Sequence, residues 1–426
     1  MKKWVVLVII LATTLGIIFW KYYPAISNMG QEKIKQVTLT YWGLSEDEQI
    51  MRPLISAFES QHPNIKINFE KQSPLNYQTR AQTQIKASPA TAGSPDIITI
   101  HESWLPAFFP DLKPAPDSSI SLADFSQTFY PVARDSLVVN NKIYAMPLEV
   151  DGLALFYNDD ILKAAGVKVP KSWQDFINVS RTLTVKNQDG QIQTAGASVG
   201  TTTNVDFWPE IIALLFLQQP GGDLRSPANN AGIEIVKFYT GFVTDPQNKT
   251  WDVNLPNSTK MFADGKLAFY FAPSSQISVI KELNPNLNFK VATVPQLPGK
   301  IVDLGSFWVK AVSVNSPNQT EAWEFLNFLA GAEVMQSVNI NKPYSRVDLA
   351  GLQINDPYLG AYVAEGPYYK AWFLNSNTGD LGINEEMIKS YKEGVDGILA
   401  GRDPMQMLQI TQTGVGQALG KYGVGK

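Results

Sequence analysis

The alternation of strand-like and helix-like segments constrains the fold of this 426-residue chain more than any other feature. Three strand-like segments, 37–42, 65–70 and 95–100, are separated by the helix-like segments 46–61 and 75–87. This order predicts a parallel sheet with helices on its faces. Because ligands gather beyond the carboxyl ends of the strands in such sheets, we expect a binding site at that edge.

The rest of the chain contains a second unit of similar kind. Strands are predicted at 153–157, 267–272 and 307–315, and helices at 159–165, 207–219, 228–242, 320–329, 384–399 and 403–419. Gly166 is expected to end the helix 159–165. Ser172 begins a further helix, with Asp175 completing a capping box, and Ser45 with Glu48 is expected to cap the helix 46–61 in the same way.

The N-terminal segment is predicted to reach a membrane. Lys2 and Lys3 precede seventeen uncharged, largely apolar residues, 4–20, with aromatic residues at both ends. This length lies at the short limit of a membrane-spanning helix. Since no clear cleavage site follows, the pattern favours an uncleaved signal anchor over 1–23 rather than a cleaved signal peptide. Residues 24–36 are then a tether, and the remainder lies outside the cytoplasmic membrane.

Composition excludes several kinds of function. The net charge is −4 without a long charged run, so the basic surface that nucleic acids require is missing. The chain has no cysteine and two histidines, which leaves little basis for metal sites or catalytic triads. No phosphate-binding glycine loop occurs. We therefore expect no cofactor, no metal and no nucleic-acid partner.

Two carboxylates, Glu149 and Asp151, stand immediately before the buried strand 153–157. Burying an unpaired carboxylate is costly, so these side chains need partners. They suit either a general acid/base pair or hydrogen-bond acceptors for a ligand. Trp42 and Trp104 stand at predicted strand ends, where a flat aromatic can cover the apolar face of a sugar.

Five motifs occur in an order typical of one family. They are LTYWG at 39–43, PDIITI at 95–100, YAMPLEVDGLALFYNDDILKAAGVKVPKSWQDF at 144–176, FADGKLAFYF at 262–271 and AWEFLNFLAG at 322–331. The chain resembles, over residues 37–420, the extracellular solute-binding proteins of ABC transporters, in their carbohydrate-binding group. It departs from the usual pattern at Ser274 and Ser275, where many relatives carry Gly-x-Trp, and at Trp308 in GSFW.

The resemblance implies an α/β, two-lobed periplasmic-binding-protein fold with a hinge and a central ligand cleft, here preceded by the membrane helix. Lobe I is expected to comprise 37–147 plus 308–345, and lobe II 148–307 plus 346–426. The implied function is capture of a sugar or oligosaccharide by hinge closure and delivery to the ABC permease, without catalysis. We expect a monomer anchored on the outer face of the cell membrane.

The resemblance also implies ligand contacts at residues that match the family's pattern, and we add candidates from strand ends and aromatic positions. Glu149 is expected to be a second acceptor or a hinge partner of Arg346. The full set of expected ligand-binding residues is Trp42, Ser45, Glu46, Gln72, Glu102, Trp104, Glu149, Asp151, Trp208, Trp308, Arg346, Tyr369 and Trp372.

Three alternative functions are compatible with the same residues. Acidic side chains and tryptophan faces around one cleft would suit a cationic solute such as a polyamine. Glu149 and Asp151 would suit an anchored glycosidase. A cell-surface adhesin or the binding module of a sensor would use the same export segment and the same fold.

Overall fold

The computed structural model describes residues 36–44, 46–86, 93–338, 341–379 and 382–424. The predicted anchor over 1–23 and nearly all of the tether lie outside these residues. Within the described part of the chain, no helix is both long and apolar enough to cross a membrane.

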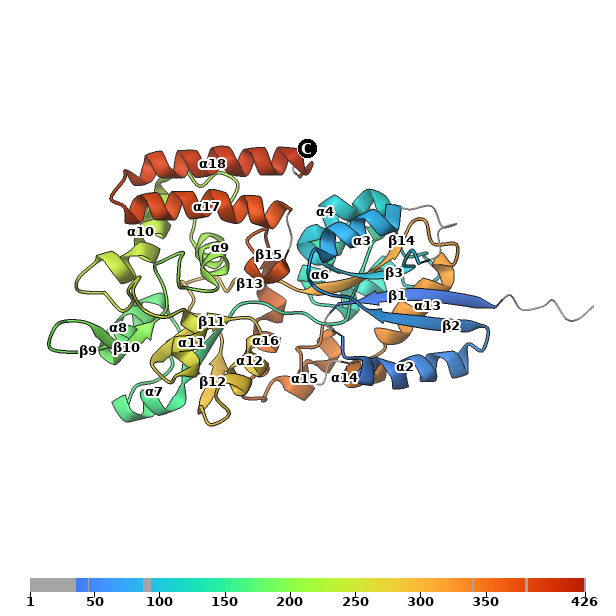
Figure 1. The fold of residues 1–426 in the computed structure, drawn as a ribbon, viewed down its shortest axis with the longest axis horizontal. Helices are drawn as coiled ribbons and strands as arrows, with labels where there is room; N and C mark the ends of the chain where they lie inside the picture. Colours follow the sequence, from blue (N-terminus) through green and yellow to red (C-terminus); the bar gives the residue numbers. More distant parts are fainter. Residues whose placement is uncertain (1–35, 45, 87–92, 339–340, 380–381, 425–426) are drawn as a thin grey trace, which may run out of the picture.

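Lobe I is built on a six-stranded sheet (Figure 1). Its strands run β2 (Ile65–Lys71), β1 (Val37–Gly43), β3 (Ile97–His101), β14 (Trp308–Ser313) and β4 (Leu112–Lys113), with β7 (Met146–Pro147) also paired to β14. The strands β2, β1 and β3 are parallel, as predicted, and β14 is antiparallel to β3. The helices of this lobe are α2 (Glu48–Gln61), α3 (Tyr77–Lys86), α4 (Leu105–Phe108), α5 (Leu122–Thr128), α6 (Pro131–Leu137), α13 (Gln319–Leu329) and α14 (Ala332–Val338), and a short hairpin joins β5 (Val138–Val139) to β6 (Lys142–Ile143).

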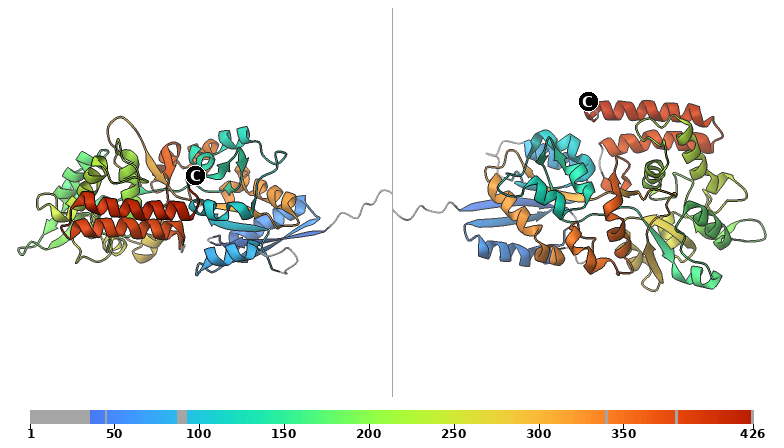
Figure 2. Two further views of the ribbon diagram at one scale, coloured as in Figure 1. Left: turned by 90° about the horizontal axis from the view of Figure 1, so that it is seen from above. Right: turned by 180° about the vertical axis from the view of Figure 1, so that it is seen from behind.

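Lobe II has a five-stranded sheet of its own. The order is β12 (Phe289–Ala292), β8 (Ala154–Asn158), β11 (Leu267–Ala272), β10 (Ile192–Ala197) and β9 (Val185–Lys186). Its helices are α7 (Asp159–Ala165), α8 (Trp173–Leu183), α9 (Trp208–Gln218), α10 (Asn230–Thr244), α11 (Ser258–Ala263), α12 (Gln276–Leu283), α16 (Gly360–Glu365), α17 (Ile383–Leu399) and α18 (Pro404–Lys421), with the short α15 (Ala350–Gln353) leading into them from lobe I. Helices α17 and α18 lie side by side along this lobe (Figures 1 and 2).

Each lobe has a separate hydrophobic core, as two folding units require. One cluster of buried side chains gathers around the six-stranded sheet and the other around the five-stranded sheet. Leu148, Val150, Leu349 and Tyr369 pack in the cluster of lobe I although the chain is passing between the lobes there. The predicted residue boundaries of the lobes stay a prediction.

Local sequence signals explain where several helices begin and end. Asn158 caps α7 by accepting hydrogen bonds from Asp160 N and Ile161 N, and α7 ends at Gly166 in the left-handed conformation. The predicted cap of α8 is confirmed, because Ser172 accepts from Asp175 N.

The predicted capping box of the first helix is wrong. Helix α2 begins at Glu48, and the side chain of Asp47 accepts from Gln49 N. Ser45 lies outside the described residues. Asp47 lies one residue from the predicted helix start at Glu46, and an aspartate side chain caps a helix as well as a serine does.

The hinge consists of three crossing segments, 148–153, 303–307 and 342–350. Glu149 pairs with Tyr344 and Gly152 pairs with Gly305 through isolated antiparallel bridges. Leu304 O accepts from Leu153 N at 3.1 Å, and Asp151 O accepts from Ser306 N at 2.9 Å. The three segments therefore support one another where the chain passes between the lobes.

A side chain at position 152 is expected to disturb this pairing. A Cβ atom there would lie 2.4 Å from Leu304 O and 2.4 Å from the ring of Tyr369. Gly152→Ala should lower the free energy of unfolding by about 1–3 kcal/mol, because the backbone oxygen cannot move aside cheaply. Gly241→Ala in α10 is the matched control, since nothing lies within 4 Å of its Cβ position, and it should stabilise by about 0.5–1 kcal/mol. Denaturant unfolding of the full-length protein measures both, and equal stability of the two variants would contradict the expectation.

Candidate functional site

A cavity of about 880 Å³ lies between the two lobes beside the hinge. Residues that face it include Glu46, His101, Trp308 and Lys310 of lobe I, Phe207, Glu210, Ser274, Tyr358 and Asn375 of lobe II, and Glu149, Asp151, Gly152, Ser306 and Lys342 of the hinge. A site of this size and mixed apolar and polar character suits a small molecule.

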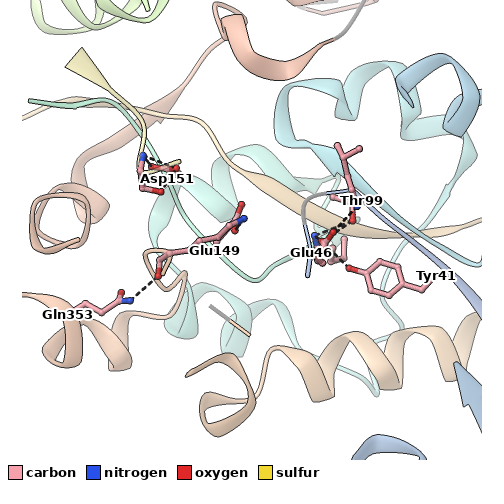
Figure 3. Close-up of polar contacts among 10 residues, drawn as sticks. Tyr41, Glu46, Thr99, Glu149, Asp151 and Gln353 are labelled. Carbon is pink, nitrogen blue, oxygen red and sulfur yellow. Dashed lines mark hydrogen bonds and ion pairs between the residues drawn. The ribbon is translucent and has the colours of Figure 1, made fainter. Parts of the chain in front are cut away.

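The wall from lobe I contains a buried ion pair. Glu46 follows β1 and contacts the Lys310 ammonium group from β14, and the two side chains are only 8% and 6% exposed. Tyr41 OH and Thr99 Oγ1 each donate to Glu46 Oε1 at 3.1 Å (Figure 3). The carboxylate and the lysine therefore neutralise each other inside the wall, and neither needs a charged ligand.

His101, at the end of β3, is neutral in this site. It is buried, and its two ring nitrogens lie 2.7 Å from Ser103 Oγ and 3.0 Å from Ser306 Oγ. Burial lowers the pKa of His101 to about 3. The ring of Trp308 packs edge-on against His101 with centroids 5.2 Å apart. This corner of the cavity thus offers an indole and uncharged polar groups.

Asp151 joins the hinge to lobe II. Its Oδ2 accepts from Ser274 Oγ at 2.6 Å, and Oδ1 accepts from Ser274 N at 3.1 Å and from Gly152 N at 2.8 Å. Burial nevertheless raises the pKa of Asp151 to about 7. Ser274, where many relatives carry the Gly-x-Trp motif, therefore has a role here in holding the hinge carboxylate.

Glu149 has a cation as its hinge partner, as one of the two expectations held, but the cation is Lys342 rather than Arg346. Glu149 pairs with the ammonium group of Lys342, two positions before Tyr344 in the neighbouring hinge segment (Figure 3 shows Glu149 beside Asp151). Arg346 instead pairs with Asp348 at 2.7 Å and donates to Ala330 O at 3.1 Å. The guanidinium thus satisfies the carbonyl end of α13, and such a helix end attracts a cation.

The wall from lobe II contains Glu210, which sits in the first turn of α9. Its Oε1 accepts from Ser376 N at 2.6 Å and from Ser376 Oγ at 2.8 Å. Burial raises the pKa of Glu210 to about 7. Asn375 lies next to it, and its neighbour Asn384 donates from Nδ2 to Ser103 Oγ at 2.7 Å, which links lobe II to lobe I.

Four of the predicted residues face the cavity: Glu46, Glu149, Asp151 and Trp308. The structure places these others elsewhere among its described residues: Trp42, Gln72, Glu102, Trp104, Trp208, Arg346, Tyr369 and Trp372. Ser45 lies outside the described residues.

The aromatic residues outside the cavity have packing roles. Trp42 and Trp104 belong to the core of lobe I and Trp208 to that of lobe II, each less than 9% exposed. Tyr369 is buried against Gly152 at the hinge. Trp372 lies under the guanidinium of Arg225, 5.4 Å from its ring centroid. Trp42 and Trp104 were predicted to bind ligand because they stand at strand ends. Their rings instead lie in the core of lobe I, where burial of a large ring stabilises the fold.

Of the predicted polar residues outside the cavity, Gln72 has a hydrogen-bond partner and Glu102 is buried. Gln72 Oε1 accepts from Arg80 at 2.8 Å. Glu102 is 5% exposed, and burial raises its pKa well above the usual range. Glu102 follows His101 in the chain and does not line the cavity.

Lys310 and Glu210 were missed by the sequence reasoning although a signal existed. Each is the one charged residue in an otherwise apolar segment, 307–315 and 207–219. A charge in a buried segment needs a partner, and such positions cluster at functional sites. Lys342 and Asn375 lie in irregular segments with no pattern, so only the folded chain identifies them.

The possible metal ligands of the described residues do not form a cluster. Within the residues that the structure describes, no group of three or more His, Cys, Asp or Glu side chains is placed to hold a metal ion. The cavity is instead lined by one indole, neutral polar groups and carboxylates, of which Glu46 and Glu149 are paired with lysines.

Comparison with proteins of known sequence and structure agrees with this architecture. The chain is 22% identical to the melibiose/raffinose/stachyose-binding protein MelE of Bacillus subtilis over 82% of this chain and 83% of that protein. It is 22% identical to the multiple sugar-binding protein of Streptococcus mutans over 73% of this chain and 75% of that protein. The sugar-binding protein MalE of Xanthomonas citri shares the fold, with a TM-score of 0.74 and 19% identity over 90% of this chain and 98% of that chain.

A family assignment follows from a wider match. Residues 53–340 match the family described as bacterial extracellular solute-binding protein. The matched range includes two of the three hinge segments, the whole sheet of lobe II, the sheet of lobe I except β1, and most of the cavity wall. The chain belongs to the family of bacterial extracellular solute-binding proteins.

Proposed function

We propose that this protein captures a neutral sugar or oligosaccharide outside the cytoplasmic membrane and delivers it to the permease of an ABC importer. One observation carries the choice of ligand. Four carboxylates of the cavity wall, Glu46, Glu149, Asp151 and Glu210, each have at least one partner within the protein, and they lie beside an indole and neutral polar groups. Sugars combine apolar C–H faces with hydroxyl groups and match such a wall.

The described residues of the wall carry six carboxylates against three lysines, so it is the pairing of these charges that disfavours a cationic solute such as a polyamine. Asp47 and Asp356 are exposed, and burial raises the pKa of Asp151 and Glu210 to about 7. Lys310 neutralises Glu46, and Lys342 neutralises Glu149. A third lysine that faces the cavity, Lys281, lies over the ring of Tyr358 at 3.7 Å from its centroid. Binding a polycation would place its charges beside these lysines, which costs free energy in a low-dielectric cavity.

The same contacts disfavour a glycosidase. A catalytic acid/base pair needs one carboxyl group free to donate a proton and another free to attack or to activate water. Glu149 pairs with Lys342, and both oxygens of Asp151 accept hydrogen bonds from Ser274. These two carboxylates therefore hold the hinge, and we propose that the protein binds its ligand without chemical change.

The remaining parts of the proposal concern location and partners. The relatives named above are sugar-binding proteins by name, and the resemblance to the solute-binding proteins of ABC transporters implies delivery of the ligand to permease subunits. We propose that residues 1–23 anchor the protein, as a monomer, on the outer face of the membrane. Closure of the lobes about the hinge would let the permease distinguish the loaded from the empty protein.

Calorimetric titration of the full-length protein with melibiose, raffinose, maltotriose, mannobiose and spermidine tests the ligand class. We expect a sugar to bind, with an affinity that salt barely changes, and spermidine to give no salt-sensitive binding. Small-angle scattering should show compaction when the sugar saturates the protein. Spermidine binding without sugar binding would contradict the proposed ligand, and a constant radius of gyration at saturation would contradict hinge closure.

Trp308 is expected to contribute strongly to sugar affinity. Trp308→Ala removes the tryptophan side chain that faces the cavity and should weaken binding of the tightest sugar about 10- to 100-fold, because aromatic contact area dominates such sites. Trp372→Ala is the matched control, since Trp372 is partly exposed and lies outside the cavity wall. Titration of both variants with the same sugar measures the difference. Equal affinities would contradict a role for Trp308 in binding.

A further inference from the structure

Two oxygen atoms of the cavity wall have no hydrogen-bond partner among the described residues. They are Oε2 of Glu210 and Oδ1 of Asn375. Both residues face the cavity, and their side chains are only 6% and 2% exposed. Each oxygen exposes less than 1 Å², so solvent does not supply the missing donors in this arrangement of the lobes. A buried polar atom left in this state costs about 1–3 kcal/mol and calls for an explanation. A ligand hydroxyl reaches these oxygens when they become exposed as the lobes move apart about the hinge.

The other polar atoms of both side chains form hydrogen bonds that hold the side chains in place, and only these two of their oxygens have no donor among the described residues. Ser376 donates twice to the other oxygen of Glu210. Asn375 Nδ2 donates to Trp372 O at 2.6 Å, and Asn375 N donates to Asn384 Oδ1 at 3.2 Å. Because Asn375 and Ser376 are consecutive, the two remaining oxygens belong to one patch of the wall.

The chemistry of this patch is that of two acceptors without donors. An amide carbonyl and a carboxylate oxygen both accept hydrogen bonds. The elevated pKa of Glu210 has the same cause, because its ionised form is buried with one oxygen unsatisfied. Adjacent hydroxyl groups on a sugar ring supply two O–H donors a short distance apart.

We propose, resting on the function proposed above, that Glu210 and Asn375 form a subsite that accepts hydrogen bonds from two neighbouring hydroxyl groups of the bound sugar. Glu210 belongs to α9, and Asn375 to the segment that precedes α17, so the subsite lies on lobe II. Through Asn384 and Ser103 it adjoins His101 on lobe I. A sugar ring seated there would extend from this subsite toward the corner that holds His101 and Trp308.

The decisive variant is Glu210→Gln. The donors of Ser376 require an acceptor, so the amide oxygen must face Ser376 and the amide NH₂ then takes the position of Oε2. The change turns an acceptor into a donor with almost no change of volume. Affinity for the tightest of the four sugars, melibiose, raffinose, maltotriose and mannobiose, should fall about 10- to 100-fold, with the thermal unfolding temperature unchanged. Glu234→Gln, a surface change at the Gln219 contact on α10, should leave affinity unchanged.

Deoxygenated derivatives of that sugar separate a direct contact from an indirect effect. The loss caused by Glu210→Gln should shrink toward nothing for the derivative that lacks the hydroxyl facing Glu210, as a double-mutant cycle requires of two groups in contact. An affinity that Glu210→Gln leaves unchanged would overturn the subsite while the sugar-binding function stands. Failure of the wild-type protein to bind any of the four sugars would overturn both.

A crystal structure of the wild-type protein with the tightest sugar tests the subsite even if Glu210→Gln does not fold. Hydroxyl oxygens within hydrogen-bonding distance of both Glu210 Oε2 and Asn375 Oδ1 are the expected result. A sugar seated elsewhere in the cavity, with both oxygens still unpartnered, would overturn the inference.

Discussion

Lys310→Met is expected to lower the free energy of unfolding by about 3–5 kcal/mol, because it leaves the buried carboxylate of Glu46 without its cation. Both side chains are nearly inaccessible, so water cannot solvate Glu46 in place of the lysine. Tyr41 and Thr99 still donate to that carboxylate, but neutral donors compensate a buried charge only in part. Denaturant unfolding of the full-length protein measures the loss.

Two controls isolate the buried charge. The double variant Glu46→Gln with Lys310→Met removes both charges and should recover much of the stability. Lys66→Met breaks a pair with Glu59 in which the lysine is 57% exposed, and it should cost less than about 1 kcal/mol. A loss at Lys310 no greater than the loss at Lys66 would show that the pair in the cavity wall is solvated and contributes little.

Stability is expected to fall as pH rises from about 5 to 8. Burial raises the pKa of Asp151, Glu210 and Asp303 to about 7. Burial, together with the nearby charge of Asp303, raises the pKa of Glu365 well above the usual range. The folded protein therefore binds protons more tightly than the unfolded chain, whose carboxyl groups titrate near pH 4.

The sign follows from proton linkage. These groups contribute stability that is fully present below about pH 4 and is lost as pH rises through about 7. His101, whose folded pKa is lowered to about 3, acts in the opposite direction between that value and about 6.5. Burial also lowers the pKa of Lys310 well below its usual value, which acts in the same direction as His101. The four raised carboxyl groups outnumber these two bases, and one pKa unit corresponds to about 1.4 kcal/mol. We expect a net loss of at least about 3 kcal/mol between pH 5 and 8.

Urea unfolding across that pH range provides the measurement. Glu365→Gln removes one titrating group with almost no change of volume, so the dependence on pH should become shallower. Asp135→Asn, in the exposed pair with Lys370, should leave the dependence unchanged. A stability that stays flat or increases from pH 5 to 8 would show that these carboxyl groups are solvated in the folded protein.

Local patterns in the sequence predicted most of the architecture, because each depends on residues close together in the chain. Periodicity located β1, β2 and β3 to within two residues at each end, and it located β11 to the residue. Asn158 and Ser172 signalled helix starts through hydrogen bonds that span three residues. The misplaced start of α2 shows the limit of such signals, since two acceptors stood near one helix end.

The candidate site depended far more on tertiary structure. The sequence alone placed Glu46, Glu149, Asp151 and Trp308 at a ligand site, and these residues face the cavity. It could not identify their partners, because Glu46 and Lys310 are separated by 264 positions and meet only when β14 joins the sheet beside β3. Tryptophans at strand ends were equally ambiguous, since the choice between cleft and core depends on which neighbouring helix covers the ring.

The sequence by itself determined two α/β units and a family whose members bind solutes. Tertiary structure alone decided the charge of the cavity. Whether a carboxylate attracts a cation or a hydroxyl group depends on the lysine or serine that lies beside it in the fold. Those contacts join segments that are distant in the chain, and the free energy of a buried charge is determined by such contacts rather than by local sequence.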